Sequence, residues 1–451
     1  MCGISGITGV KYSNSNQSSI INKMLASINH RGPDTNGVWS DNYISLGHNS
    51  LSIIDLSDNG KQPMQNEDWV ITYDGEIYNY IEIKKELQEK HRIVFNTESD
   101  TEVILAAWDI WKEKALNKFR GMWAFAIYNK KTHDLYLCRD RFGIKPVYYY
   151  NKNGILLFSS EIKAILEGHV IPRRMYLPAV ADFLVGFHDH NEFTFFKDII
   201  QVPPGHYLYL NLVNNNRKLT KFYDLTRATE DRISTIDEFA QVFEETILLH
   251  LRSNIPVGIC LSGGLDSSSV ASIAAYHMRN SLNKSLHAVT AQSEDSLNDE
   301  TIYARQVVQH SDLIWHVIKP SVNDFLQEWE QCLWFQDEPI GGPSIFMQYY
   351  VMKTANKAGL KVILDGQGGD EALLGYERYY PTMFLHWLKK GRLSNCYNEF
   401  SNAIQNSKLN TKQMVMYTVY FLSPKIRVLR NAKKYEQIPK QVLEYGLNTL
   451  R

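Results

Sequence analysis

The chain has 451 residues, of which 44% are hydrophobic and 22% are charged, a composition typical of a globular protein and a length beyond what one hydrophobic core usually serves. Lys and Arg number 48 against 49 Asp and Glu, so the formal net charge of -1 gives no electrostatic reason to expect a nucleic-acid or anionic membrane partner. The five cysteines are scattered and lack the close pairing of a zinc site, which predicts reduced thiols in a cytoplasmic protein that acts on small molecules.

The first part of the chain, residues 1–209, is predicted to be an α+β domain. It begins without the basic region and apolar core of a secretion signal. Short β-branched and aromatic runs alternate with Gly, Asn, Asp and Pro turns, which indicates antiparallel strands at 69–73, 122–128, 135–137, 147–150 and 155–158. Apolar residues recur at helical spacing over 19–27, 80–90 and 101–113, so we expect strands stacked against helices.

A polar stretch rich in turn formers follows, and we assign residues 210–234 to a linker. Strand and helix patterns then alternate through a second domain, residues 235–451. Helical spacing covers 235–251 and 267–278, and apolar strands are expected at 257–261, 285–290, 313–317 and 361–364. This alternation predicts a parallel sheet in an α/β domain. The apolar run 415–422 is far too short to span a bilayer.

Cys2 directly follows the initiator Met. Removal of Met1 would expose the α-amine of Cys2, whose unperturbed pKa of about 8 allows it to act as a base near neutral pH. Nucleophile and base would then belong to one residue. Four motifs that combine turn formers, charges and strand ends follow in order, at 30–34 (HRGPD), 51–55 (LSIID), 75–79 (GEIYN) and 99–100 (SD).

With Cys2 and these motifs, the chain resembles the class II glutamine amidotransferases, which are N-terminal nucleophile (Ntn) hydrolases, and among them the asparagine synthetase family. The resemblance implies an Ntn sandwich in which Cys2 attacks the side-chain amide of glutamine, forms a γ-glutamyl thioester and releases ammonia. It also implies that the Gly75 N–H is an oxyanion donor and that Glu76 and Asp100 hold the α-amino group. The implied glutamine-binding residues are Ser50, Leu51, Ser52, Ile53, Ile54, Asp74, Gly75, Glu76 and Asp100.

Two positions depart from the family pattern. The family usually has Arg where this chain has Ser50, and that Arg binds the α-carboxylate of glutamine through two hydrogen bonds. The family also has Asn, a donor to the tetrahedral oxyanion, at the catalytic position where this chain has Asp74. An ionised carboxylate repels an oxyanion, and loss of one such donor costs about 100-fold to 1000-fold in rate. We therefore predict a weak glutaminase unless Asp74 is held protonated.

The second domain has a turn, Ser262–Ser268 (SGGLDSS), between an apolar strand and a helix. Its glycines permit close backbone approach, while its hydroxyls and the helix N–H groups face an anion. It is not the loop of Walker NTPases, because no Lys follows the glycines. It resembles the PP-loop of enzymes that cleave ATP to AMP and pyrophosphate, which implies an α/β adenine nucleotide-binding domain.

An acidic loop, residues 365–371 (DGQGGDE), follows a later strand, and its carboxylates could hold Mg²⁺ against phosphates. Together with 337–339 (DEP), the two loops match the asparagine synthetase pattern in order. The resemblance implies that Asp266 and Asp370 bind Mg²⁺. Gln367 is a catalytic candidate, because it stands where the family often has a Glu that assists the acyl-adenylate. The implied ATP-binding residues are Leu261, Ser262, Gly263, Gly264, Leu265, Asp266, Ser267, Ser268, Ala291, Asp365 and Gly366.

The resulting hypothesis is ATP-dependent conversion of L-aspartate to L-asparagine through a β-aspartyl-adenylate, with ammonia supplied from L-glutamine. Two alternatives stay open: an amidotransferase or ring-forming ligase that acts on another carboxylate, and a non-catalytic homologue that binds a partner. A homodimer is also left open. Family members usually continue further as a helical region, so we expect either a shortened chain or a site that is completed in another way.

Overall fold

The computed structural model describes residues 1–9, 14–51, 53, 60–184, 192–227, 235–295, 299–407 and 409–423. The first domain contains two antiparallel six-stranded sheets. The first sheet has the order β10 (Ile199–Gln201), β8 (Tyr148–Lys152), β9 (Ile155–Ser159), β1 (Gly3–Gly9), β3 (Ile44–Ser50), β2 (Thr35–Ser40). The second has the order β12 (Arg217–Lys221), β11 (His206–Asn211), β7 (Asp134–Arg139), β6 (Gly121–Asn129), β5 (Trp69–Ile77), β4 (Met64–Gln65).

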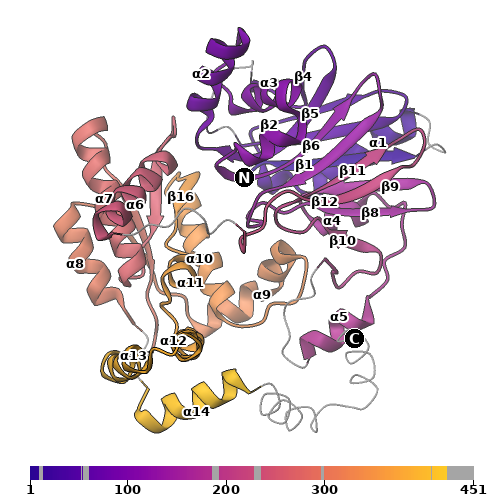
Figure 1. The fold of residues 1–451 in the computed structure, drawn as a ribbon. Helices are drawn as coiled ribbons and strands as arrows, with labels where there is room; N and C mark the ends of the chain where they lie inside the picture. Colours follow the sequence, from indigo (N-terminus) through magenta and orange to yellow (C-terminus); the bar gives the residue numbers. More distant parts are fainter. Residues whose placement is uncertain are drawn as a thin grey trace.

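The two sheets face each other across an apolar core, and helices cover their outer faces (Figure 1). Helices α1 (Asn14–Ser27) and α4 (Ile162–Glu167) pack on the first sheet, and α2 (Tyr80–His91) and α3 (Asp100–Trp111) pack on the second. Alternation along β5 explains the layering: Trp69, Ile71 and Tyr73 point to the helices, while Val70 points into the sandwich. The predicted α+β Ntn sandwich is therefore confirmed.

Runs of β-branched and aromatic residues predicted five strands of this domain, β5 to β9. Strands β1, β2, β3, β4, β10, β11 and β12 were not predicted. Residues 217–221, which we assigned to the linker, form β12 and pair antiparallel with β11. The polar residues between these two strands are the turn of a hairpin, and turn residues have the same composition as a linker. The helix expected over 101–113 ends at Trp111 and continues as a 3₁₀ helix over Lys112–Asn117.

The second domain contains a parallel sheet with the order β15 (Ile314–Ile318), β14 (His287–Ala291), β13 (Val257–Cys260), β16 (Val362–Leu364). Helices α6 (Ile236–His250), α7 (Leu265–Leu282) and α8 (Thr301–Ser311) share one apolar cluster with β13, and α10 (Ser344–Lys357) shares another with β14. The remaining helices are α5 (Leu177–Leu184) in the first domain and α9 (Val322–Gln336), α11 (Gly369–Leu373), α12 (Tyr380–Lys389), α13 (Leu393–Asn406) and α14 (Thr411–Leu422) in the second. The predicted α/β architecture is confirmed.

The order in which strands are added to this parallel sheet reverses at β13. The chain runs from β13 to β14 and β15 on one side, and β16 then pairs with β13 on the other side. In such sheets ligands bind beyond the carboxyl ends of the strands at this switch point. The fold therefore places a candidate site where residues 261–268 follow β13 and residues 365–371 follow β16.

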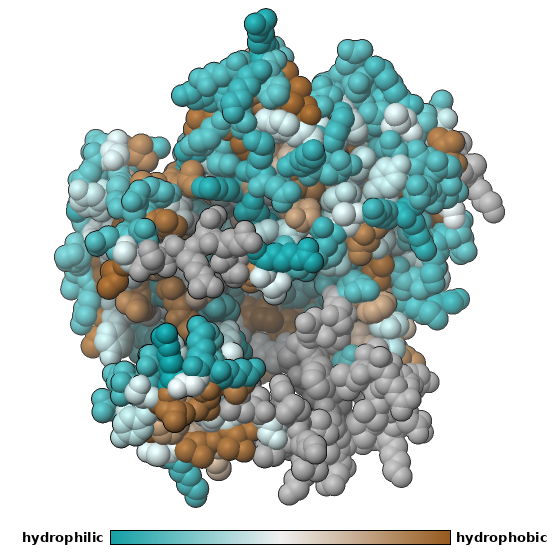
Figure 2. All heavy atoms as spheres, viewed as in Figure 1, coloured by the Kyte–Doolittle hydropathy of each residue, from teal (hydrophilic) through white to brown (hydrophobic). Residues whose placement is uncertain are grey.

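Helices α12, α13 and α14 form a small cluster of their own around Phe384, Ala403 and Met414. Figure 2 shows apolar side chains gathered on the outer surface of these helices, and the exposed ones include Leu388, Leu393, Val415, Met416 and Val419. Within the described part of the chain, no helix is both long enough and apolar enough to cross a membrane.

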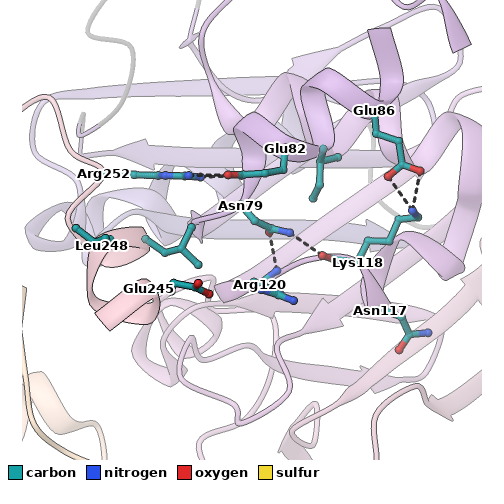
Figure 3. Close-up of a pocket in the computed structure, with 11 residues that line it drawn as sticks. Asn79, Glu82, Glu86, Asn117, Lys118, Arg120, Glu245, Leu248 and Arg252 are labelled. Atoms are coloured by element: carbon teal, nitrogen blue, oxygen red, sulfur yellow. Dashed lines mark hydrogen bonds and ion pairs between the residues drawn. The ribbon is translucent and has the colours of Figure 1, made fainter. Parts of the chain in front are cut away.

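The two domains contact each other directly. Arg252 after α6 binds Glu82 on α2 at 2.6 Å, and Lys361 before β16 binds Asp34 at 2.7 Å. Figure 3 shows a pocket at the first of these contacts. Its lining residues are Asn79, Glu82, Ile83, Glu86, Asn117, Lys118, Arg120, Glu245, Leu248, Leu249 and Arg252. None of the predicted catalytic, glutamine-binding or ATP-binding residues lines it, so we place the chemistry elsewhere.

Candidate active site

Cys2 lies immediately before β1, at the end of the sandwich. Its Sγ atom accepts a hydrogen bond from the Leu51 N–H at 3.4 Å and donates to the Leu51 carbonyl at 3.7 Å. Burial and the charge of Asp74 raise the pKa of the Cys2 thiol to about 11. Burial lowers the pKa of the terminal amine on Met1 to about 6. At neutral pH the thiol therefore carries its proton, and the terminal amine of Met1 is largely unprotonated.

The predicted glutamine-binding stretch 50–54 begins at the end of β3. Leu51 is the residue that contacts the thiol, and Ser50 and Ile53 are half-buried beside it. Ser52 and Ile54 lie outside the described residues. The structure thus brings the start of this stretch to the nucleophile.

Asp74 is fully buried on β5 and forms an ion pair with Arg31, whose Nη2 atom lies 2.8 Å from Oδ2. Burial acts to raise the pKa of Asp74, but the charges of Lys145 and Arg31 outweigh burial and hold that pKa below its ordinary value. The carboxyl group is therefore ionised, and the protonated form that we allowed for does not apply. Arg31 Nε also donates to the Cys2 carbonyl at 2.7 Å, so a cation lies beside both the nucleophile and the carboxylate that we expected to repel an oxyanion.

Gly75 has no room for a side chain, because a Cβ atom there would lie 2.3 Å from the Met122 carbonyl oxygen. On the neighbouring strand, the Trp123 N–H donates to Asp140 Oδ2 at 3.2 Å, and the Trp123 carbonyl accepts from the Asp140 N–H at 2.8 Å. Gly75 lies opposite Trp123 in an antiparallel ladder, so its own N–H points away from β6. This orientation suits the predicted role of the Gly75 N–H as an oxyanion donor.

The half-buried Glu76 and the buried Asp100 form a pair of neighbouring carboxyl groups. Asp100 Oδ2 accepts hydrogen bonds from the Tyr73 hydroxyl at 2.7 Å and from the Ile77 N–H at 3.0 Å. Burial raises the pKa of Asp100 to about 6, and burial together with the charge of Asp100 raises the pKa of Glu76 well above its ordinary value. Two such groups ionise together only when a cation joins them. The pair therefore suits the α-ammonium group of an amino acid.

Three charged residues around Cys2 received no role from the sequence. Arg31 lies in the HRGPD motif that we noted for its position alone, and Lys145 and Glu161 were not singled out. Arg31 Nη1 lies 3.1 Å from Glu161 Oε1, and Lys145 is buried within electrostatic reach of Asp74. The DEP motif was noted only for its match to the family pattern, and the structure places Asp337 beside Lys163 at the domain boundary.

The turn Ser262–Ser268 carries the chain from β13 into α7. Gly263 has a φ of +95°, and a Cβ atom there would lie 2.6 Å from the Ala304 backbone nitrogen, so only glycine fits. Ser262 Oγ accepts from the Gly264 N–H at 3.1 Å and lies 3.0 Å from Ser267 Oγ. Gly264 is the N-cap of α7 and supplies no side-chain cap. The first N–H groups of an 18-residue helix thus face outward, as an anion requires.

The acidic loop packs directly onto this turn. A Cβ atom on Gly366 would lie 2.9 Å from the Ser267 backbone nitrogen, and one on Gly369 would lie 2.3 Å from Asp266 Oδ2. Burial and the charge of Asp370 raise the pKa of Asp266. The two predicted metal ligands are therefore neighbours that repel each other.

The other predicted ATP-binding residues surround the same place. Leu261 follows β13 and its N–H donates to the Val289 carbonyl at 3.0 Å, while Ala291 ends β14. Asp365 follows β16 and accepts from the Gln367 N–H at 3.2 Å. The structure therefore gathers residues from the ends of three adjacent parallel strands around one turn.

Fold and site together define a class: an amidotransferase sandwich joined to a nucleotide-binding synthase domain. Residues 1–223 match the family model of the glutamine amidotransferase domain, and residues 238–440 match that of asparagine synthase. A putative asparagine synthetase (glutamine-hydrolyzing) 2 of Methanocaldococcus jannaschii is 34% identical over 418 residues, which are 86% of this chain and 78% of that protein. The chain belongs to the glutamine-hydrolysing asparagine synthetase family.

Two further relatives show the breadth of this similarity. Asparagine synthetase (glutamine-hydrolyzing) 1 of Bacillus subtilis is 34% identical over 395 residues, which cover 85% of this chain and 60% of that protein. Amidase chry2 of Gibberella zeae is 30% identical over 409 residues, which cover 84% of this chain and 60% of that protein. The matched part of the chain thus spans less than two thirds of the length of these two relatives.

Proposed function

We propose that this protein is an ATP-dependent, glutamine-hydrolysing ligase that converts L-aspartate to L-asparagine. The observation that carries the proposal is the arrangement of Asp266 and Asp370 around the turn Ser262–Ser268, at the switch point of the sheet. An uncapped helix N-terminus and two adjacent carboxylates suit a polyphosphate and its cation. Family membership also supports the proposal, because the same chain matches both a glutamine amidotransferase domain and an asparagine synthase domain.

In the first domain, the α-amine of Cys2 accepts the thiol proton once Met1 has been removed. The thiolate attacks the amide carbon of glutamine, and the Gly75 N–H and the local cation Arg31 stabilise the tetrahedral oxyanion. The amine returns the proton to the leaving nitrogen, so ammonia departs and a thioester to Cys2 remains. Water then hydrolyses the thioester to glutamate. Glu76 and Asp100 hold the α-ammonium group of the substrate through these steps.

In the second domain, the turn Ser262–Ser268 holds the β- and γ-phosphates while the aspartate side-chain carboxylate attacks the α-phosphorus of ATP. Pyrophosphate leaves, and the product is β-aspartyl-adenylate. Ammonia attacks the acyl carbon, loses a proton and displaces AMP. Gln367 is exposed at the acidic loop beside the turn, where it can contact the adenylate. Activation by ATP is needed because a carboxylate oxygen is a poor leaving group, and the protein mainly positions the reactants.

Mg²⁺ suits this site, because the cation usually binds one or two protein carboxylates together with substrate phosphates. Asp266 and Asp370 would hold it. Among the described residues no group of three His, Cys, Asp or Glu side chains is arranged to bind a metal, so phosphate oxygens would complete the coordination. When bound, the cation would neutralise negative charge on the departing pyrophosphate.

Pyrophosphate release by the purified chain tests the proposal. The assay uses ATP and Mg²⁺ with aspartate, with other carboxylates or with no acceptor, and it supplies either glutamine or free ammonia. We expect release that depends on aspartate and on a nitrogen donor, and asparagine as the product. No uptake of ATP, or release that ignores aspartate, would rule this function out.

A second candidate is ligation of ammonia to a carboxylate other than aspartate. It is favoured by the similarity to Amidase chry2, which extends over 84% of this chain, since that protein is not named as an asparagine synthetase. The same assay separates the two functions: release that occurs with another acid and not with aspartate would establish the second.

A further inference from the structure

An alternating series of buried charges runs from the Cys2 site to the second domain, and we call it the ionic chain. Its members are Asp74, Arg31, Glu161, Lys163 and Asp337. Arg31 lies 2.8 Å from Asp74 and 3.1 Å from Glu161. Lys163 contacts Glu161 through Oε2 and lies 3.0 Å from Asp337 Oδ1. Four members belong to the first domain, and the last belongs to the second.

All five side chains of the ionic chain are shielded from water. In the order given, they are 1, 6, 10, 11 and 9% exposed. A buried charge is tolerated only when its partners are in place, and removal of one partner leaves its neighbour uncompensated. The position of each of the three inner members therefore depends on both of its neighbours. Loss of Asp337 removes the partner of Lys163. Lys163 in turn contacts Glu161, and Glu161 contacts Arg31.

The end of the ionic chain in the first domain reaches the nucleophile itself. The Arg31 guanidinium that binds Asp74 and Glu161 also donates from Nε to the Cys2 carbonyl at 2.7 Å. One planar group thus fixes the backbone of the nucleophile and the carboxylate next to the predicted oxyanion donor.

The end in the second domain is docked firmly on the first. Asp337 Oδ2 accepts a hydrogen bond from the Ile162 N–H at 2.7 Å, and Glu338 Oε1 accepts from the Phe195 N–H at 2.7 Å. The ring of Trp334, on the last turn of α9, lies 4.9 Å from the ring of His30 and 4.5 Å from Lys163 Nζ. Helix α9 therefore covers the middle of the ionic chain.

The segment that follows Asp337 connects the ionic chain to the nucleotide site. The segment that begins at Asp337 leads directly into α10, where the Gln348 side-chain amide lies 3.5 Å from Asp365 Oδ2 in the acidic loop. The same short stretch of the second domain thus contacts the ionic chain at one end and the acidic loop at the other.

We propose that Asp337 is a positioning residue of the glutaminase site, although it belongs to the synthase domain. Through Lys163, Glu161 and Arg31 it holds the Cys2 carbonyl and Asp74 in place for glutamine hydrolysis. The glutaminase site is incomplete until the second domain is docked. This inference rests on the proposed glutaminase activity and adds a residue from outside the domain that carries it.

The test compares Asp337→Asn, Asp337→Ala and Asp337→Glu in the full chain. Two rates are measured: ammonia release from glutamine, and pyrophosphate release with aspartate and free ammonia. For Asp337→Asn and Asp337→Ala we expect kcat for glutamine to fall about 10-fold to 100-fold, because small displacements at a catalytic group have effects of this size. The rate with free ammonia should stay within about twofold of wild type, and Asp337→Glu should recover part of the loss, since it keeps the charge.

Lys361→Met is the matched control, because Lys361 pairs with Asp34 across the same boundary but outside the ionic chain. It should leave both rates unchanged. The inference is overturned if Asp337→Asn keeps its glutamine rate, if both rates fall together, or if Lys361→Met lowers the glutamine rate equally.

A measurement without turnover separates this inference from the proposed function. Iodoacetamide labelling of Cys2, followed by peptide mass analysis, should be several times faster in Asp337→Asn, because a loosened site exposes the thiol. If wild type hydrolyses no glutamine, the proposed glutaminase fails, and labelling alone decides. Equal labelling rates in wild type and Asp337→Asn would then overturn the role of Asp337.

Discussion

The two candidate sites handle charge in opposite ways. Around Cys2, the ionised groups are buried and paired within the protein, as in the contact between Arg31 and Asp74. At the phosphate turn, Asp266 faces Asp370, and burial together with that like charge raises the pKa of Asp266. Beside the nucleophile the protein itself supplies the compensating charge, whereas the phosphate turn needs a cation and phosphates to balance it. The Glu76 and Asp100 pair resembles the phosphate turn in this respect, because it needs the ammonium group of a substrate.

The largest effect on activity is expected when the nucleophile of the first site is removed. Cys2→Ala removes the nucleophile, so ammonia release from glutamine should fall by more than about 1000-fold. Pyrophosphate release with aspartate and free ammonia should remain, because no residue of the second site has changed. Loss of both rates would show that the two sites are not separable in this way.

Asp370→Asn sharpens the contrast at the second site. The variant removes a predicted ligand of Mg²⁺, so pyrophosphate release should fall on the order of 100-fold. It also removes a like charge beside Asp266, so thermal unfolding should show no loss of stability. Scanning calorimetry without nucleotide checks the second point, and a lower Tm would mean that the carboxylate pair is stabilising in the free protein.

Asp74→Asn tests the prediction of a weak glutaminase. The amide restores an oxyanion donor while its oxygen can still accept the hydrogen bond from Arg31, so we expect ammonia release to rise about 10-fold, a part of what one donor contributes. The same change leaves Arg31 without its nearest buried anion, so stability should fall by about 3 kcal/mol. Urea unfolding and the glutaminase assay measure the two effects separately. A rate that stays the same would show that Arg31 and Lys145 already compensate the charge of Asp74.

The smallest expected effect is a change with pH in the KM for glutamine, whose α-ammonium group we expect Asp100 to bind. Because burial raises the pKa of Asp100 to about 6, its carboxylate is charged at pH 7 and becomes neutral as the pH falls through 6. The KM for glutamine should therefore rise about tenfold between pH 7 and pH 5. Initial rates across this range provide the measurement. A KM that stays constant down to pH 5 would remove Asp100 from glutamine binding.

The sequence by itself determined the class of both domains and the local shape of both sites. Runs of β-branched and aromatic residues bounded by turn formers predicted β5 and β6. The glycines of the turn Ser262–Ser268 predicted a tight turn there. The structure agrees, because Gly263 has a φ of +95°, which favours glycine. Both signals are local, so they can be read from neighbouring residues.

Only the tertiary structure decided which charges meet. Arg31 and Glu161 are 130 positions apart, and Ile162 and Asp337 are 175 apart, so no periodicity connects them. The ionised state of Asp74 depends on Lys145 and Arg31, which reach it from other segments. Coulomb energies depend on distance and burial rather than on order in the chain. The balance of charge beside the nucleophile therefore appears only after distant segments of the chain have folded together.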